Sequence, residues 1–199
     1  MVNADLPRGA VPSRHRNGAP YNGSGTVYYV PDTYDTALFV GDPVIVVTSA
    51  ADANGVPVVA RATAAGGNYI TGFVQSLAFH GDPPIPVLRG SGRYHAASTA
   101  GYILVCDDPD VLFEMQEDGV GGAMGAGAAG RNADLIIGTG STVSGWSGAE
   151  LDSNTLDVTN TLQMQIIAPV ERSDNDITLT NAKWLVQVNL HSQRNLLGI

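Results

Sequence analysis

Residues 101–116 read GYILVCDDPDVLFEMQ and place two short apolar runs on either side of a polar turn. The runs at 101–106 and 111–116 contain β-branched and aromatic residues, whereas 107–110 holds three aspartates and one proline. Strands separated by turn residues have this composition. Because the pattern recurs from Thr26 onwards, the sequence predicts a protein built mainly from β-strands.

Other parts of the chain show the same strand and turn signals. Apolar residues at 162, 164 and 166 alternate with glutamines, which predicts a strand with one buried and one solvated face. The sequence DANG at 52–55 is typical of a tight hairpin turn. GDP at 41–43 should bend its run, because proline cannot donate to a central ladder. The remaining strand segments are 26–30, 38–48, 56–62, 69–79, 133–138, 161–168 and 182–190.

The composition favours an all-β fold over the other fold classes. Charged residues make up 15% of the chain, and 24 glycines and 11 prolines among 199 residues imply many turns. Outside a turn near 108–116, no window longer than about ten residues offers a helical pattern free of glycine and proline, so helix content should be low. We therefore expect a jelly-roll-like or β-barrel body.

Two segments fall outside the strand pattern. Residues 1–25 contain three prolines and four glycines with almost no apolar periodicity, so they are expected to form an extended N-terminal arm that is poorly anchored by itself. Residues 26–199 then form the β-rich body. Residues 119–130 hold six glycines and four alanines and are expected to form a flexible loop, an insertion or a second arm.

The chain is acidic, and its charge is unevenly distributed. The formal net charge of −9 at pH 7 argues against nucleic-acid binding by neutralisation of phosphates. Residues 1–31 hold three arginines against one aspartate, so the arm is basic and the body acidic. The acidic run at 107–118 is expected to be a solvated edge or a docking site for a basic partner. Residues 1–5 lack a targeting pattern, so we expect a soluble protein without membrane contact.

The sequence contains incomplete versions of two catalytic or binding motifs. Gly125–Gly130 has the spacing of a dinucleotide fingerprint with Glu150 beyond it, but a glycine-rich loop stands where the fingerprint needs a strand. GWSGA at 145–149 is a broken nucleophile elbow, so a hydrolase built on His191 and one of Ser141, Ser144 and Ser147 has weak support. A mobile or polar loop explains both segments better.

The remaining reactive residues also lack a motif. The four histidines are scattered without metal-ligand spacing. Cys106 is the only cysteine, so the chain can form no intramolecular disulfide, and a buried core thiol is the expected role. We therefore expect no catalytic residues, no cofactor and no metal.

Five segments spread over most of the chain carry a resemblance to a known family. They are RHRNGAPYNG at 14–23, LFVGDPV at 38–44, YHAASTAGYILVCDDPDVLFEMQEDGVGG at 94–122, NADLIIGTGSTVSGWS at 132–147 and KWLVQVNLH at 183–191. Together they resemble the cement, or decoration, proteins on the heads of tailed bacteriophages. None of the segments is a catalytic signature, so the resemblance implies no active site.

The resemblance implies a structural role in the virion. It predicts a body that is assembled in the host cytoplasm, sits on the outside of a shell of major capsid protein, and forms a homo-oligomer, a dimer in preference to a trimer. Terminal arms would reach across capsomer boundaries. Candidate contacts with the capsid are Arg8, Arg14 and Arg16, which can pair with carboxylates, and Tyr21, an amphipathic anchor.

Two other function classes stay open at this point. One is a receptor- or carbohydrate-binding β module of a virion, with Trp146 in a polar loop as its contact. The other is an enzyme, for which no constellation of residues is complete. The cement interpretation further predicts that deletion of residues 1–25 leaves the body folded and weakens binding to the shell.

Overall fold

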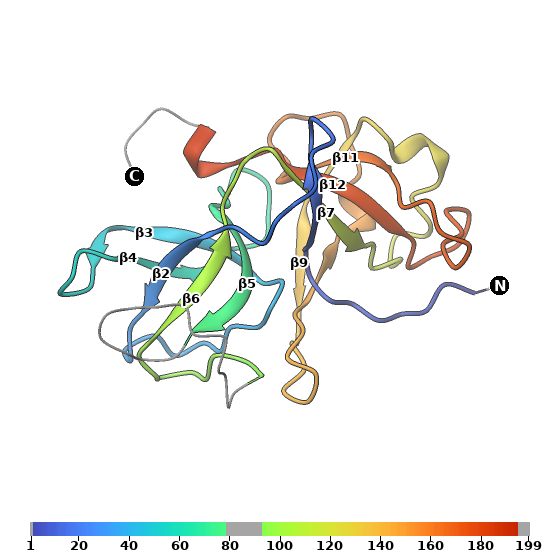
Figure 1. The fold of residues 1–199 in the computed structure, drawn as a ribbon. Helices are drawn as coiled ribbons and strands as arrows, with labels where there is room; N and C mark the ends of the chain where they lie inside the picture. The colour runs from blue at the N-terminus through green and yellow to red at the C-terminus, as the bar shows by residue number, and fades with distance from the viewer. Residues whose placement is uncertain (1, 79–92, 195–199) are drawn as a thin grey trace.

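The computed structural model describes residues 2–78 and 93–194, and its strands form a closed barrel beside a separate five-stranded sheet (Figure 1). The prediction of an all-β fold with a β-barrel body is therefore confirmed. Helical structure in the described residues is limited to three short 3-10 turns, at Ala126–Ala128, Ser153–Thr155 and Ser192–Arg194. The low helix content follows from the frequent glycine and proline.

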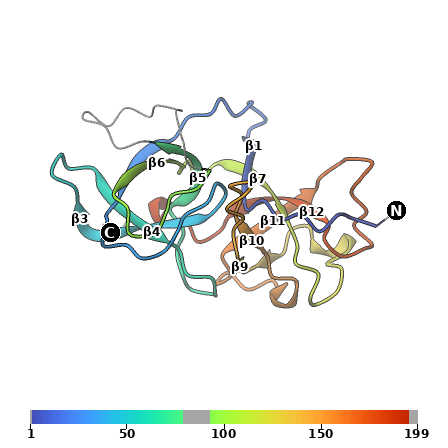
Figure 2. The ribbon, with the colours of Figure 1, turned by 90° about the horizontal axis from the view of Figure 1, so that it is seen from below.

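The first half of the chain builds the closed barrel. Its strands are β2 (Thr26–Val30), β3 (Pro43–Ala51), β4 (Pro57–Arg61), β5 (Gly72–Ala78) and β6 (Gly101–Cys106). They are neighbours in the order β2, β4, β3, β5, β6, and Figure 2 shows them as a ring. The ring closes because β6 pairs with both β2 and β5 and β2 pairs with β4.

Aliphatic side chains fill the barrel and the predicted turns bound its strands. β3 begins at Pro43, the last residue of the predicted 41–43 turn, and the 52–55 turn lies between β3 and β4. Each fully buried aliphatic side chain contributes about 1.5–3 kcal/mol. The barrel side chains with no exposed surface are Val30, Leu38, Val44, Val59, Ile103 and Val105.

The second half of the chain, with one N-terminal strand, builds the other sheet. Its strands lie in the order β1 (Val11–His15), β7 (Val111–Gln116), β12 (Lys183–Val188), β11 (Met164–Pro169) and β8 (Asn132–Ala133). A separate hairpin pairs β9 (Leu135–Gly138) with β10 (Gly148–Leu151). The predicted alternation is confirmed within β11, because Met164 and Ile166 are buried and Gln165 between them is half-buried. Just before the strand it is wrong, because Gln163 is fully buried and its side-chain amide donates to the carbonyl of Thr63 (2.9 Å).

One aromatic contact joins the two β-structures. The ring of Phe73 on β5 packs against the ring of Phe113 on β7, with 4.8 Å between the ring centroids. Both rings belong to one apolar cluster that also contains the fully buried Trp184 of β12. A tilted aromatic pair of this kind adds about 0.5–1.5 kcal/mol beyond its buried area. The barrel and the sheet therefore share a core.

The N-terminal segment is extended, as expected, but it is anchored to the body. β1 pairs with β7 in antiparallel fashion. Nearer the terminus, the Asn3 side-chain amide donates to the backbone oxygens of Asp176 (2.8 Å) and Thr180 (2.9 Å). The expectation of poor anchoring is therefore wrong. The physical reason is that β7 offers a backbone ladder, whose hydrogen bonds do not require apolar periodicity in the added strand.

The same segment touches the barrel at two glycines. Ala10 N–H donates to the carbonyl of Gly41 (3.1 Å), and a Cβ at Gly9 would lie 2.3 Å from that oxygen. Gly9 and Gly41 also have φ angles of 67° and 93°, which favour glycine. Residue 25 is therefore not a boundary between an arm and the body, because residues 1–25 contain β1, an edge strand of the five-stranded sheet. Deletion of residues 1–25 would remove that strand.

The glycine-rich tract at 119–130 forms a loop, as predicted, and part of it packs on the second sheet. Ala128 is fully buried in the main apolar cluster, and Gly130 N–H donates to the carbonyl of Ile166 (2.8 Å). Its regular structure is the single 3-10 turn at Ala126–Ala128. Small side chains let the backbone of this loop approach the sheet closely.

Candidate functional site

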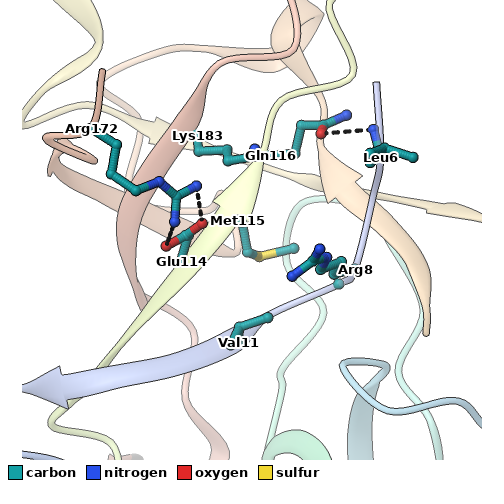
Figure 3. A pocket seen from close by; sticks show the side chains of 9 residues that line it. Leu6, Arg8, Val11, Glu114, Met115, Gln116, Arg172 and Lys183 are labelled. Atoms are coloured by element: carbon teal, nitrogen blue, oxygen red, sulfur yellow. Dashed lines mark hydrogen bonds and ion pairs between the residues drawn. The ribbon is translucent and has the colours of Figure 1, made fainter. Parts of the chain in front are cut away.

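A pocket of about 170 Å³ lies between the N-terminal segment and strands β7 and β12 (Figure 3). Strand register places its side chains, because Val11 pairs opposite Glu114 and Lys183 opposite Gln116. Ahead of β1, the Leu6 N–H donates to Gln116 Oε1 (3.1 Å) and holds the segment over the sheet. Residues far apart in the chain therefore meet at one pocket.

The lining of this pocket is cationic. Arg8, Arg172 and Lys183 line it together with a single carboxylate, Glu114. Two guanidinium nitrogens of Arg172 lie 2.9 and 3.0 Å from the two Glu114 oxygens. Arg8 and Lys183 have no carboxylate partner within residues 2–78 and 93–194. In a chain with a net charge of −9, two unpaired cations in one cavity create a local positive potential. We call this cavity the cationic pocket.

A second pocket, of about 230 Å³, adjoins the cationic pocket, and we call it the Trp146 pocket. Val11 lines both pockets. The guanidinium carbon of Arg8 lies 5.8 Å from the centre of the Trp146 ring, so a cation–π contact marks the border between them. The apolar lining includes Pro12, Val40, Val74 and Trp146, and the polar lining is Tyr21 and Gln75, whose side chains hydrogen-bond each other (2.5 Å).

The structure separates the four predicted capsid contacts. Arg8 lines the cationic pocket and Tyr21 the Trp146 pocket. Arg14 is exposed on β1, and Arg16 donates to Gln187. Arg14 and Arg16 line neither pocket. Burial raises the pKa of the Tyr21 hydroxyl, so this side chain stays a neutral hydrogen-bonding anchor.

Two cations of the site were not predicted from the sequence. Arg172 lies in the loop after β11, and Lys183 begins β12. Both are remote in sequence from Arg8. Strand register brings Lys183 to the pocket, and the ion pair with Glu114 holds Arg172 there. One signal in the sequence was available, because Lys183 is the only lysine of the chain. Trp146, the predicted contact of a receptor module, is half-buried beneath Arg8 rather than freely exposed.

A cluster of carboxylates lies beside the cationic pocket. Gln116 Nε2 donates both to Asp5 Oδ1 (3.0 Å) and to Glu150 Oε1 (2.9 Å). The pKa of Glu150 is raised to about 7, by burial first and then by the negative charges of Asp5 and Asp118, while the Gln116 hydrogen bond opposes the shift. Glu150 therefore titrates near neutral pH next to the bound N-terminal segment.

The catalytic interpretations gain no geometric support from the structure. Gly125–Gly130 lies in the packed loop, with neither a strand running into it nor a helix longer than one 3-10 turn leaving it. Ser147 is buried and donates to Asp42, whose pKa is raised by burial, rather than to a histidine. His191 accepts from the Gln193 N–H (3.2 Å), and burial lowers its pKa to about 4.

The acidic run is largely used within the fold. Tyr28 donates to Asp107 (2.8 Å), Arg194 pairs with Asp110 (2.5 Å), and Trp184 donates to the buried Glu117 (3.0 Å). Few carboxylates of residues 107–118 therefore remain available to bind a basic partner. Cys106 is buried, and burial raises its pKa to about 11, which keeps the thiol protonated and unreactive at neutral pH.

No family model, curated protein or solved structure matches this chain. Among residues 2–78 and 93–194, no group of three or more histidine, cysteine, aspartate or glutamate side chains is arranged to hold a metal ion. In the same described ranges, no helix has the length and apolar character needed to cross a bilayer. The fold and the site therefore define a β-barrel protein with a cationic surface pocket, and its function has to be inferred from that pocket.

Proposed function

We propose that this chain is a non-enzymatic structural protein that binds the outer surface of an assembled bacteriophage capsid and stabilises it by bridging subunits of the major capsid protein. The observation that carries the proposal is the presence of two cations, Arg8 and Lys183, without carboxylate partners in the described residues of an acidic protein. Such cations are suited to carboxylates on another protein. The resemblance to phage cement proteins indicates which protein that is.

The character of the pocket supports docking rather than catalysis. Its side chains are Leu6, Val11 and Met115 together with Gln116 and the charged residues, so it offers apolar contact and charge but no serine, cysteine or histidine. The one carboxylate in it, Glu114, is held by Arg172. A charged pocket with an apolar floor is typical of a protein interface.

Stabilisation of the shell would follow from mass action. A protein that binds the assembled lattice and not free subunits shifts the equilibrium toward the lattice, by about 2.7 kcal/mol per site at a free concentration of 100 times Kd. A homo-oligomer would strengthen the effect, because each additional copy binds at a high effective concentration. Many moderately tight contacts would then suffice.

The proposal is tested by co-sedimentation of the purified chain with empty, expanded phage shells over a range of salt concentrations. We expect saturation at a ratio that matches the icosahedral lattice, and weaker binding at high salt because exposed charges are screened beyond about 10 Å at 0.1 M. Absence of binding at every salt concentration would overturn the proposal.

A further inference from the structure

We infer that the two adjoining pockets form one docking site for an extended segment of the partner protein, in which the cationic pocket receives a carboxylate side chain and the Trp146 pocket an apolar side chain. This inference rests on the proposed function and specifies the chemistry by which the chain recognises its partner. The occupant is thus an acidic and apolar segment of another protein, not a nucleic acid, a lipid or a metal ion.

The charges select a carboxylate for the first pocket. The planar guanidinium of Arg8 can present two N–H groups to one carboxylate, and the ammonium of Lys183 adds a compact positive charge. Glu114 does not compete for them, because both of its oxygens are already bound by Arg172. The pair holds Arg172 in place and leaves the other two cations available.

The second pocket selects an apolar neighbour. Its walls carry Pro12, Val40, Val74 and the ring of Trp146, while Tyr21 and Gln75 satisfy each other at the polar side. Each buried CH₂ group of a guest would contribute about 0.8 kcal/mol. The two pockets share Val11 and meet at the Arg8–Trp146 contact. A single extended guest can therefore reach both.

The surrounding charge adds selectivity. The chain as a whole has a net charge of −9, so a partner with many carboxylates is repelled on average, and a site with two cations stands out against that background. Like-charge repulsion disfavours incorrect placements of the partner, and local attraction favours the single correct placement. Together they fix the register of an interface. A carboxylate-bearing segment of the partner can then bind in a single orientation.

The single lysine of the chain gives a direct test. A carbodiimide joins an amine to a carboxylate as an amide and takes up the water that is lost, and Lys183 is the only side-chain amine that this chain can supply. In the shell-bound protein we expect a cross-linked peptide that joins Lys183 to an aspartate or glutamate of the capsid protein. Bound protein that yields no cross-link at Lys183 would overturn the inference while leaving the proposed function intact.

Charge variants provide the matched comparison. Arg8→Glu and Lys183→Glu should each weaken shell binding about tenfold or more, by loss of attraction and gain of repulsion. Arg14→Glu makes the same change in net charge on an exposed arginine of β1. Arg14 was a candidate capsid contact by sequence, but it lies outside both pockets, so the two-pocket site predicts that this variant weakens binding less than about threefold. Equal effects of Arg14→Glu and Arg8→Glu would show that net charge alone matters. Lys183→Arg should keep binding and abolish the cross-link, and thermal unfolding checks that each variant is folded.

A small probe tests the pockets without any shell. Isovalerate carries a carboxylate and a branched apolar group, whereas isoamyl alcohol has the apolar group alone. Titrated into the full chain, isovalerate should cause saturable shifts of the backbone amide signals of Val11, Met115 and Lys183, and the alcohol should cause smaller shifts near Trp146 only. Identical responses to the two probes, or none, would contradict the inference. If the shell experiment fails and this one succeeds, the proposed capsid is wrong but the docking chemistry stands.

Discussion

Arg8 lies over the ring of Trp146, with its guanidinium carbon 5.8 Å from the ring centre. The contact joins the N-terminal segment to the loop that precedes β10 (Gly148–Leu151) and forms the border between the two pockets. It also explains why Trp146 is half-buried in a loop rich in serine and glycine. A segment with little apolar periodicity is thus held by one cation, one aromatic ring and a β-ladder.

Replacement of Trp146 by alanine should loosen this attachment. A cation–π contact at a partly exposed site contributes about 0.5–1 kcal/mol, and the lost packing brings the expected fall in unfolding free energy to about 1–2 kcal/mol. Urea denaturation measures the change. Trp146→Phe retains an aromatic face and should lose less than half as much. Unchanged stability of Trp146→Ala would show that the contact does not hold the segment.

The approach of Gly9 to Gly41 should make position 9 intolerant of any side chain. Gly9→Ala brings a Cβ to 2.3 Å from a carbonyl oxygen at φ 67°, and we expect a loss of about 3 kcal/mol or more. Gly18→Ala is the matched control, because Gly18 has φ 89° but no atom within 4 Å of the added Cβ. It should lose only about 1–2 kcal/mol from backbone strain. Similar losses in both variants, measured by denaturation, would contradict the close approach.

The stability of the fold should depend on the hydrogen bonds that the buried carboxylate of Glu117 accepts. Trp184 Nε1 donates to Glu117 Oε2 (3.0 Å), and the Met124 N–H lies 3.2 Å from the same oxygen. Trp184→Phe keeps an aromatic ring but removes one donor from a fully buried carboxyl group, so the free energy of unfolding should fall by about 2–4 kcal/mol. Phe113→Leu, which alters the same apolar cluster without touching a charge, separates packing from hydrogen bonding. Near-equal denaturation midpoints for wild type and Trp184→Phe would argue against the bond.

Glu150 should make stability depend on pH in a defined direction. Its pKa is raised from 4.5 to about 7, by burial first and then by the charges of Asp5 and Asp118. The folded chain therefore binds the Glu150 proton more tightly than the unfolded chain, and the stabilising effect of this proton is lost as pH rises from 4.5 through 7. Glu150→Gln removes this loss, so its gain over wild type should be larger at about pH 8 than at about pH 5.

The control for this pH dependence is Asp5→Asn. Because Asp5 raises the pKa of Glu150 by its charge, its removal should move the titration of Glu150 to lower pH without abolishing it. Thermal unfolding midpoints across the pH range report both variants. A difference between Glu150→Gln and wild type that is the same at every pH would show that Glu150 does not titrate in this window.

Local sequence pattern predicted the strands that carry a run of five or more mostly apolar residues and missed shorter or more polar ones. The segments 26–30, 101–106 and 111–116 match β2, β6 and β7 to the residue. β1 reads VPSRH, which shows no apolar alternation, and β10 reads GAEL, in which only Ala149 and Leu151 alternate with a polar residue. These strands form because neighbouring strands offer backbone partners, which is a tertiary effect that short-range pattern cannot report.

The site was predictable only in part for the same reason. Arg8 could be proposed because it stands in a basic segment of an acidic chain. Lys183 reaches the pocket through the pairing of β12 with β7, and Arg172 reaches it through its ion pair with Glu114. Sequence spacing says nothing about strand order, so the composition of the pocket followed only from the sheet topology.

The number of copies of the chain in an isolated phage particle tests the central claim most directly. Quantitative mass spectrometry of purified particles gives the molar ratio of the chain to the major capsid protein, and electron microscopy locates it. The account predicts many copies in a fixed ratio set by the icosahedral lattice, all on the outside of the head. A few copies confined to the tail or to single vertices, or none in the particle, would contradict it.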